Sequence, residues 1–472
     1  MSKAKPLSGH KPVRWIATLA VMGLAGCSLI PTYERPVAPV PAHFSSANDS
    51  AQAGSQQPAA ADIAWQDFFK DTRLQRLIEL ALQNNRDLRV AVLNIEQTRA
   101  LLQVKRADEL PTVNAGITGS RVPNAAGSIT STFTAGLSVT SYEVDLFGRV
   151  RALSQAAQAQ LLASEEARKT VHIALVASVA NAYLNVRADD ALLQIARDTV
   201  ASREASLRLT QLKFNNEAAS QLELSLAQSL LEGAKASLAQ FTRQRAQDEN
   251  ALVLLLGQSL PADLPEGLPL TQQALLPDLP AGTPAELLLR RPDVRQAEQL
   301  LLANNANIGA ARAAFFPRIS LTGSAGLVSG EMNSLFNNGS AAWSFTPQVL
   351  VPIFDAGRNQ ANLDTAKVGR DIAIAQYEKA IQVGFREVSD ALVARDTYNE
   401  QVRAQSAQLA AEETRLQLTD LRYTHGASNA LELLDAKRSL FATQQATVLA
   451  QVQQVQSLVN LYKVLGGGWT AK

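Results

Sequence analysis

The histidines of this 472-residue chain, the side chains most often used as metal ligands and general bases, are few and scattered. They are His10, His43, His172 and His425. The first two lie in segments that we expect to be cleaved off or extended, and neither of the others has a partner at metal-ligand spacing. The chain also contains no glycine-rich phosphate loop and no GxSxG nucleophile elbow. These residues predict no metal site, no cofactor and no enzymatic activity.

The single cysteine, Cys27, indicates a different chemistry. Residues 1–26 start with four basic residues and no acid, and Trp15–Leu24 is an apolar stretch too short to span a bilayer. This pattern is typical of an export signal peptide. The run Leu24–Cys27 resembles the bacterial lipobox, which implies that Cys27 becomes the lipid-modified first residue of the mature protein. A free buried thiol or an intermolecular bridge is the alternative for a lone cysteine. Ser28 after the cysteine implies sorting to the outer membrane.

The charge and composition exclude further classes of protein. Removal of residues 1–26 would leave 40 basic and 43 acidic residues, and without a basic surplus we expect no nucleic-acid partner. Hydrophobic residues make up 46% of the chain but aromatic residues only 5%, a composition that favours long, closely packed helices. Residues 27–64, rich in proline, alanine, serine and glutamine, are predicted to be an extended tether that either floats or wraps along the protein.

A duplication organises the rest of the sequence. Leu207–Leu231 recurs as Leu416–Leu440 at a constant offset of 209 residues, and the similarity continues outward on both sides. Upstream, Asn85–Leu88 matches Arg291–Val294 at an offset of 206. We therefore expect a first repeat at 65–257, a linker at 258–282, a second repeat at 283–466 and a tail at 467–472.

Each repeat is predicted to begin with one helix. These helices cover Thr72–Ala107 and Ala285–Ala314, with Asp71 and Thr283 as N-caps. A very long helix follows the strands of each repeat, from Val150 to about Phe214 and from Asn359 to about Tyr423, and a shorter one runs back to Leu256 or Leu465. In the first returning helix an apolar seam alternates steps of three and four residues. It consists of Leu224, Ala227, Leu231, Ala234, Leu238 and Phe241.

Between the helices, each repeat changes to the alternating pattern of a β-hairpin. The first hairpin is predicted within 112–147 and the second within 318–354, with the last strand reaching Phe354. The strands are near the length of a tilted membrane strand, and 131–141 and 341–354 contain no Asp, Glu, Lys or Arg. A soluble hairpin that caps a helical body is the alternative.

Counting strands constrains the assembly. Two hairpins supply four strands, whereas about eight is the smallest membrane barrel, and lipid does not tolerate an open sheet edge. If the hairpins enter a membrane, the chain must oligomerise. Two copies would give eight strands around a filled interior. Three copies would give twelve strands above twelve long helices.

Three motifs relate this chain to a known family. They are RRPDVRQAE (Arg290–Glu298), FFPRISLTGSAG (Phe315–Gly326) and the C-terminal run Thr419–Trp469. With the lipobox and the TYERP that follows it, they resemble the outer-membrane factors of the TolC kind, in the lipoprotein branch typified by OprM. The resemblance implies a mainly α, internally duplicated chain that forms a trimeric, 12-stranded outer-membrane β-barrel continued by a 12-helix periplasmic α-barrel. It also implies an exit channel for multidrug efflux, with outer-membrane lipids, a periplasmic adaptor and an inner-membrane resistance–nodulation–division (RND) transporter as partners.

The resemblance also implies a gate at the periplasmic end, around 214–222 and 423–431. Residues matching Leu431, Asp435 and Arg438 line the constriction in OprM-like proteins, and Tyr423 matches a residue in the bonding that holds it shut. Asp435 and Arg438 replace the first repeat's Leu226 and Ser229, as expected if only one helical pair bends inward. An ordinary surface pair worth about 0.3 kcal/mol is the alternative.

Small polar turns at the same end are candidates to receive the tip of an adaptor hairpin, although any turn is rich in such residues. The turn residues are Ala218, Ala219, Ser220, Gly426, Ala427, Ser428 and Asn429. Two other functions remain open. One is the outer-membrane channel of type I protein secretion, and the other is a lipid-anchored periplasmic coiled-coil scaffold without a pore.

Overall fold

A computed structural model describes residues 28–41, 44, 59–123, 127–273, 279, 290–338 and 340–470. The predicted signal peptide, the predicted lipid-attachment residue Cys27 and the predicted N-cap Thr283 lie outside the described residues. The chain divides into two compact units. One comprises residues up to Val37 with 94–165 and 296–378, and the other comprises 38–93, 166–295 and 379 onward. Each unit takes segments from both sequence repeats.

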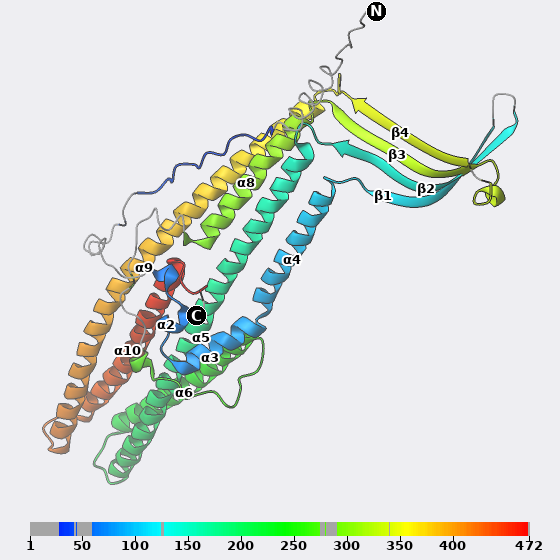
Figure 1. Ribbon diagram of the computed structural model, residues 1–472. Coiled ribbons are helices and arrows are strands. Elements are labelled where there is room, and N and C mark those ends of the chain that lie inside the picture. Colours follow the sequence, from blue (N-terminus) through cyan, green and yellow to red (C-terminus); the bar gives the residue numbers. More distant parts are fainter. Residues whose placement is uncertain are drawn as a thin grey trace, which may run out of the picture. The chain divides into compact units, whose positions relative to one another are not determined.

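Two pairs of long helices dominate the described chain (Figure 1). The first pair is α5 (Arg149–Asn215) and α6 (Gln221–Leu256), and the second is α9 (Arg358–Thr424) and α10 (Ala430–Val464). Both α5 and α9 contain 67 residues, which confirms the predicted duplication of a very long helix. The predicted apolar seam of α6 is confirmed too, since its first four members are buried.

The first helix of each repeat differs from the prediction. The single helix expected over 72–107 is two helices, α3 (Thr72–Asn84) and α4 (Arg86–Ala107). Asn85 breaks it, because its Oδ1 accepts a hydrogen bond from the Leu88 backbone N–H at 3.0 Å and caps α4. The cap predicted for α3 is confirmed, since the Asp71 carboxylate accepts from the Arg73 and Leu74 backbone N–H groups.

The second repeat has the same break at the matching position. Arg290 is helical but Arg291 is not, and α8 covers Pro292–Ala313, while residues 285–289 of the predicted helix lie outside the described residues. The physical reason is Pro292. A proline is accommodated at the first position of a helix, and it disfavours helical geometry in the residue before it.

All four strands join one antiparallel sheet in the order β1-β2-β3-β4. They are β1 (Val113–Pro123), β2 (Ile129–Val144), β3 (Arg318–Ser329) and β4 (Ser340–Leu350). The last strand therefore ends before Phe354, because its partner β3 begins at Arg318, which lies opposite Leu350. Likewise β2 ends before Phe147, since the Asp145 carboxylate turns away to accept the Arg151 backbone N–H at the start of α5.

The strand register separates an apolar from a polar face. On one face, Ala115, Leu137, Ala325 and Trp343 form a continuous row across the sheet. On the other face, hydroxyl groups meet across strands: Thr118 and Thr134 at 2.6 Å, and Ser324 and Ser344 at 2.7 Å. The apolar side chains are not covered in the single chain, since Trp343 is 80% and Phe345 62% exposed.

The main core lies in the unit that contains α3, α6 and α10. Three short elements contribute residues to this core: η2 (Ala60–Asp62), α2 (Trp65–Phe68) and η3 (Leu270–Gln272). A fourth short element, η4 (Met332–Ser334), follows β3. The Phe68 and Tyr462 rings stack at 4.0 Å between centroids. Buried Asp71 accepts hydrogen bonds from the Tyr183 hydroxyl, the Leu268 backbone N–H and the Gln273 amide, which join three distant segments.

The start of the described chain wraps rather than floats. Glu298 on α8 accepts two hydrogen bonds from Arg35, at 2.8 and 3.0 Å, and one from the Tyr33 hydroxyl. Further along α8, the Asn305 amide donates to the Pro31 carbonyl. Among the helices that the structure describes, none is both long and apolar enough to cross a membrane.

Candidate functional site

The two turns that end the long helices have the same backbone hydrogen bonds. In the first, the Ala218 N–H donates to the Lys213 carbonyl at 2.7 Å; in the second, the Ala427 N–H donates to the Arg422 carbonyl at 2.8 Å. Each of these hydrogen bonds closes a turn of six residues, one of which has a left-handed backbone conformation. This arrangement is a Schellman motif. The left-handed position is Gly426 in one turn and Glu217 in the other, with φ of 73° and 59°.

Helix caps complete both turns. Ser220 forms a capping box with Glu223 at the start of α6, and the Asn429 side chain caps α10 by accepting the Glu432 N–H at 2.9 Å. The residues predicted to receive an adaptor lie in these turns, and most of their side chains are exposed. Their docking role stays a prediction.

Contacts between the first helical pair (α5 and α6) and the second (α9 and α10) position the predicted gate residue Tyr423. The Lys213 ammonium, on α5, donates to the Tyr423 hydroxyl at 3.0 Å and lies 4.7 Å from the centroid of its ring. Nearby, the Lys437 ammonium on α10 donates to the Ser206 hydroxyl on α5 at 2.8 Å. Burial lowers the pKa of Lys437. These contacts tie the first helical pair to the second just above the turns.

Asp435 and Arg438, the predicted charged gate pair, meet as neighbours on α10. The Arg438 guanidinium donates to Asp435 at 2.7 Å, and Arg415 on α9 donates to the other carboxylate oxygen at 2.6 Å. The hydrogen bond from Arg415, followed by the nearby positive charges, lowers the pKa of Asp435 despite some opposing desolvation. Asp435 therefore joins α9 to α10 in the second pair, in addition to making the surface pair with Arg438.

The remaining predicted gate residue, Leu431, is 61% exposed in the single chain. Sequence reasoning missed two members of this site, Arg415 and Lys213. The first could have been found by comparing the repeats, because its counterpart 209 residues earlier is Ser206. Lys213 could not have been found in this way, since its counterpart in the second repeat is the similarly basic Arg422.

A cleft lies between the two helical pairs, beside the contact of Lys213 with Tyr423. Its lining includes Ala218 and Ala219 from the first turn, Leu433 from α10, and both Lys213 and Tyr423. The site thus combines exposed turns, a cleft and polar contacts that join the two helical pairs.

Comparison with known proteins provides independent information. A family model described as "Outer membrane efflux protein" matches residues 77–258 and 283–467, one match for each repeat. The chain is 47% identical over 459 residues to the solvent efflux pump outer membrane protein SrpC of Pseudomonas putida, covering 96% of this chain and 97% of that protein. It is 45% identical to the outer membrane protein OprJ of Pseudomonas aeruginosa, covering 98% and 97%.

Solved structures show the same fold. The open state of the Neisseria gonorrhoeae MtrE outer membrane channel matches with a TM-score of 0.87 and 42% identity, over 94% of this chain and 99% of that one. A structure of CusC matches with a TM-score of 0.84 and 40% identity, over 94% and 100%. At these levels of identity and coverage, the likeness extends over nearly the whole chain.

Proposed function

Because the chain belongs to the outer membrane efflux protein family, we propose that it is the trimeric exit channel of a tripartite RND-type multidrug efflux pump. The protein is an outer-membrane efflux channel with a TolC-like fold. Its family consists of channel and transport proteins rather than enzymes. The trimer, the gate, the partners and the lipid anchor are our proposals.

The observation that carries the proposal is a two-faced sheet with two open edges. Within the described chain, β1 pairs only with β2, and β4 pairs only with β3. An open edge in lipid leaves backbone groups without partners, so these edges require strands from other copies. Three copies supply twelve strands, with the row that contains Trp343 facing lipid and the hydroxyl face lining the pore. Migration of the unheated protein as a trimer in detergent, and as a monomer after boiling, is the expected result.

We place the gate at the contacts around Asp435. Each copy would contribute one such group about the threefold axis, and the Arg415, Arg438 and Tyr423 contacts would hold the closed arrangement. Replacing Asp435 and Arg438 together by alanine is expected to raise the single-channel conductance of the purified trimer in planar bilayers. Arg403→Ala, which breaks an exposed pair with Glu400 elsewhere on α9, is the control. Unchanged conductance in the double variant would remove these residues from the gate.

The exposed turns 218–220 and 426–429 are our candidate docking surface for the periplasmic adaptor, which would in turn engage the inner-membrane transporter. A photo-crosslinking residue at Ala427 is expected to capture the adaptor in cells, whereas one at the exposed Glu400 is not. Equal capture at the two positions would contradict this docking surface. Lipid attachment at Cys27 would add a second membrane anchor, and Cys27→Ser is expected to abolish the corresponding mass increase of the mature protein.

The two other candidate functions make different predictions. A coiled-coil scaffold would give neither a heat-sensitive trimer nor a pore current. A type I secretion channel would restore protein export, rather than drug resistance, to a strain that lacks its own outer-membrane channels.

A further inference from the structure

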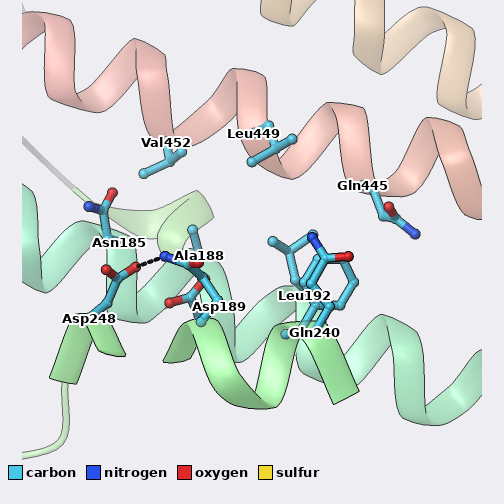
Figure 2. Close-up of a pocket in the computed structure, with 11 residues that line it drawn as sticks. Asn185, Ala188, Asp189, Leu192, Gln240, Asp248, Gln445, Leu449 and Val452 are labelled. Carbon is cyan, nitrogen blue, oxygen red and sulfur yellow. Dashed lines mark hydrogen bonds between the residues drawn. The ribbon is translucent and has the colours of Figure 1, made fainter. Parts of the chain in front are cut away.

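A pocket in the helical unit lies away from the turns and the gate contacts. It is formed between α5, α6 and α10 and has a volume of about 360 Å³. Figure 2 shows Asp189 and Asp248 from the first helical pair with Leu449 and Val452 of α10 on the opposite side. The lining is completed by Asn185, Ala188, Leu192, Gln240, Phe241, Gln244 and Gln445.

No Lys, Arg or His side chain of the described residues pairs with either of the two carboxyl groups in this pocket. Asp189 is only 4% exposed, and its Oδ2 accepts no hydrogen bond in the described structure. Its carboxyl lies against that of Asp248, which accepts a hydrogen bond from the Gln244 amide at 3.1 Å. Among the described residues, neither acid forms an ion pair.

The nearest cations are engaged by other acids. The Arg245 guanidinium donates to Asp190 at 2.8 Å and to Glu249 at 2.6 Å. Arg187 also donates to Asp190, at 3.2 Å. Asp190 on α5 and Arg245 on α6 are the further charged groups that act on Asp189, and α10 contributes only uncharged side chains to the pocket.

A buried carboxylate without a counter-charge is costly, so the pair must share a proton or receive a cation. Burial raises the pKa of Asp189 to about 7, assisted by the neighbouring carboxyl of Asp248 and by Asp190, against the opposing effect of Arg245. A single proton would neutralise only one of the two carboxylates, and it would not occupy the adjoining cavity.

We propose that this pocket binds an amphipathic organic cation, with a protonated amine between Asp189 and Asp248 and an apolar group against Leu192, Phe241, Leu449 and Val452. An ammonium offers the N–H donors that the Asp189 Oδ2 lacks. The apolar walls, which include the Phe241 ring, remove the hydrocarbon part from water. The amides of Asn185, Gln240 and Gln445 supply polar groups that can orient the ligand.

A metal ion is a poorer occupant. A Ca²⁺ ion takes six to eight oxygen ligands, usually including several carboxylates. The described residues contain no cluster of three or more His, Cys, Asp or Glu side chains that could hold a metal. The pocket instead has two acids on one side and hydrocarbon on the other, which matches a monovalent amphiphile. This site goes beyond the proposed conduit function, which requires no ligand in the channel wall, and it does not depend on the gate.

The test uses the full-length protein in a non-ionic detergent and the fluorescent primary amine dansylcadaverine. Binding is followed by the emission change of the probe at pH 8, with N-acetyl-dansylcadaverine as the uncharged analogue. Asp189→Asn keeps the shape of the side chain and can donate to Asp248 as the protonated acid would. This variant is expected to weaken binding by about tenfold or more, which corresponds to about 1.4 kcal/mol.

Asp198→Asn is the matched control, because it removes the same charge from an exposed position on α5. It is expected to bind dansylcadaverine as the wild type does, and the acetylated analogue is expected to bind neither protein measurably. Lowering the pH from 8 to 6 should weaken binding to the wild type, since protons then compete for the carboxyl pair while an aliphatic amine stays charged.

Four outcomes would overturn the proposal. Equal binding of the acetylated probe would mean that only the apolar walls contribute. Equal affinity in Asp189→Asn and the wild type would place the probe elsewhere. Calcium chloride that displaces the probe at micromolar concentration would assign the site to a metal, and no binding of either ligand would leave the pair as a holder of a proton only.

Discussion

The Arg291 guanidinium donates a hydrogen bond to the backbone carbonyl of Val464 at 2.9 Å, at the last turn of α10. Its counterpart in the first repeat, Asn85, donates from its amide to the Leu255 carbonyl at the last turn of α6, also at 2.9 Å. The final carbonyls of a helix have no partner within the helix. In both repeats, the residue that interrupts the first helix satisfies one of them, so the duplication extends to an individual hydrogen bond.

Replacing Arg291 by alanine is expected to destabilise the protein. The change removes the bond to Val464 and leaves Asp293 and Glu387, which accept from the same guanidinium at 2.6 and 2.7 Å, without this partner. We expect a loss of about 2–4 kcal/mol, because the guanidinium is buried while the carboxylates are partly solvated. Thermal unfolding followed by circular dichroism measures this loss of stability.

The neighbouring Arg290 supplies the control for that prediction. It pairs with Asp62 at 2.6 Å, but both side chains are well exposed, so Arg290→Ala is expected to change the stability by less than about 1 kcal/mol. Similar shifts in the two variants would contradict the assigned role of Arg291.

Arg415→Ala is expected to open the proposed gate by itself. The guanidinium is the link from α9 to Asp435, whereas Arg438 contacts Asp435 only along α10. Removing Arg415 should therefore raise single-channel conductance more than removing Arg438. A larger effect of Arg438→Ala would mean that contacts between copies, rather than the link between α9 and α10, hold the closure.

The two faces of the sheet should respond differently to charge. Phe345 and Thr346 are neighbours on β4 and point to opposite faces, apolar and polar. Phe345→Lys should impair insertion, at a cost of up to about 2–4 kcal/mol at the bilayer midplane, while Thr346→Lys should insert and alter ion selectivity. The amount of heat-sensitive trimer in outer-membrane fractions checks this, and the opposite result would reverse the assignment of the faces.

Glu217→Gly is expected to stabilise the first turn. Glu217 has a φ of 59°, a conformation that glycine adopts without steric strain and that Gly426 already occupies in the second turn. The gain should be about 1 kcal/mol, seen as a higher temperature of local unfolding or stronger amide exchange protection near the turn. Gly426→Ala is the reciprocal variant and should lose a similar amount.

The stability of the wild type is expected to fall as the pH rises from about 4 to about 7. Burial and Asp248 raise the pKa of Asp189 to about 7 in the folded protein, whereas an unfolded aspartate titrates near 3.9. Between those values the folded state binds more protons, so its stability decreases with pH and levels off above about 7. Asp189→Asn should flatten the unfolding temperature over this range, and Asp198→Asn should not.

Much of the helical architecture could be predicted from the sequence, because local signals specify it. Asp71 is recognisable as a cap, and the seam beginning at Leu224 repeats with the period of a packed helix. The break at Asn85 was missed, since an asparagine within a helical pattern is unremarkable until its side chain reaches the Leu255 carbonyl. That contact joins residues 170 positions apart, and no local pattern reports it.

The sequence by itself determined the duplication, the alternation of the strands and the divergence of Asp435 and Arg438 from their counterparts, because each is a property of residue order. Only the tertiary structure decided that β2 pairs with β3 to join the repeats and that Arg415 reaches Asp435. It also decided that Asp189 meets Asp248 in a pocket where neither forms an ion pair with a described residue. These relationships depend on which helices and strands become neighbours. That choice is made by packing across long stretches of chain, where burial changes the charge and hydrogen-bonding needs of each side chain.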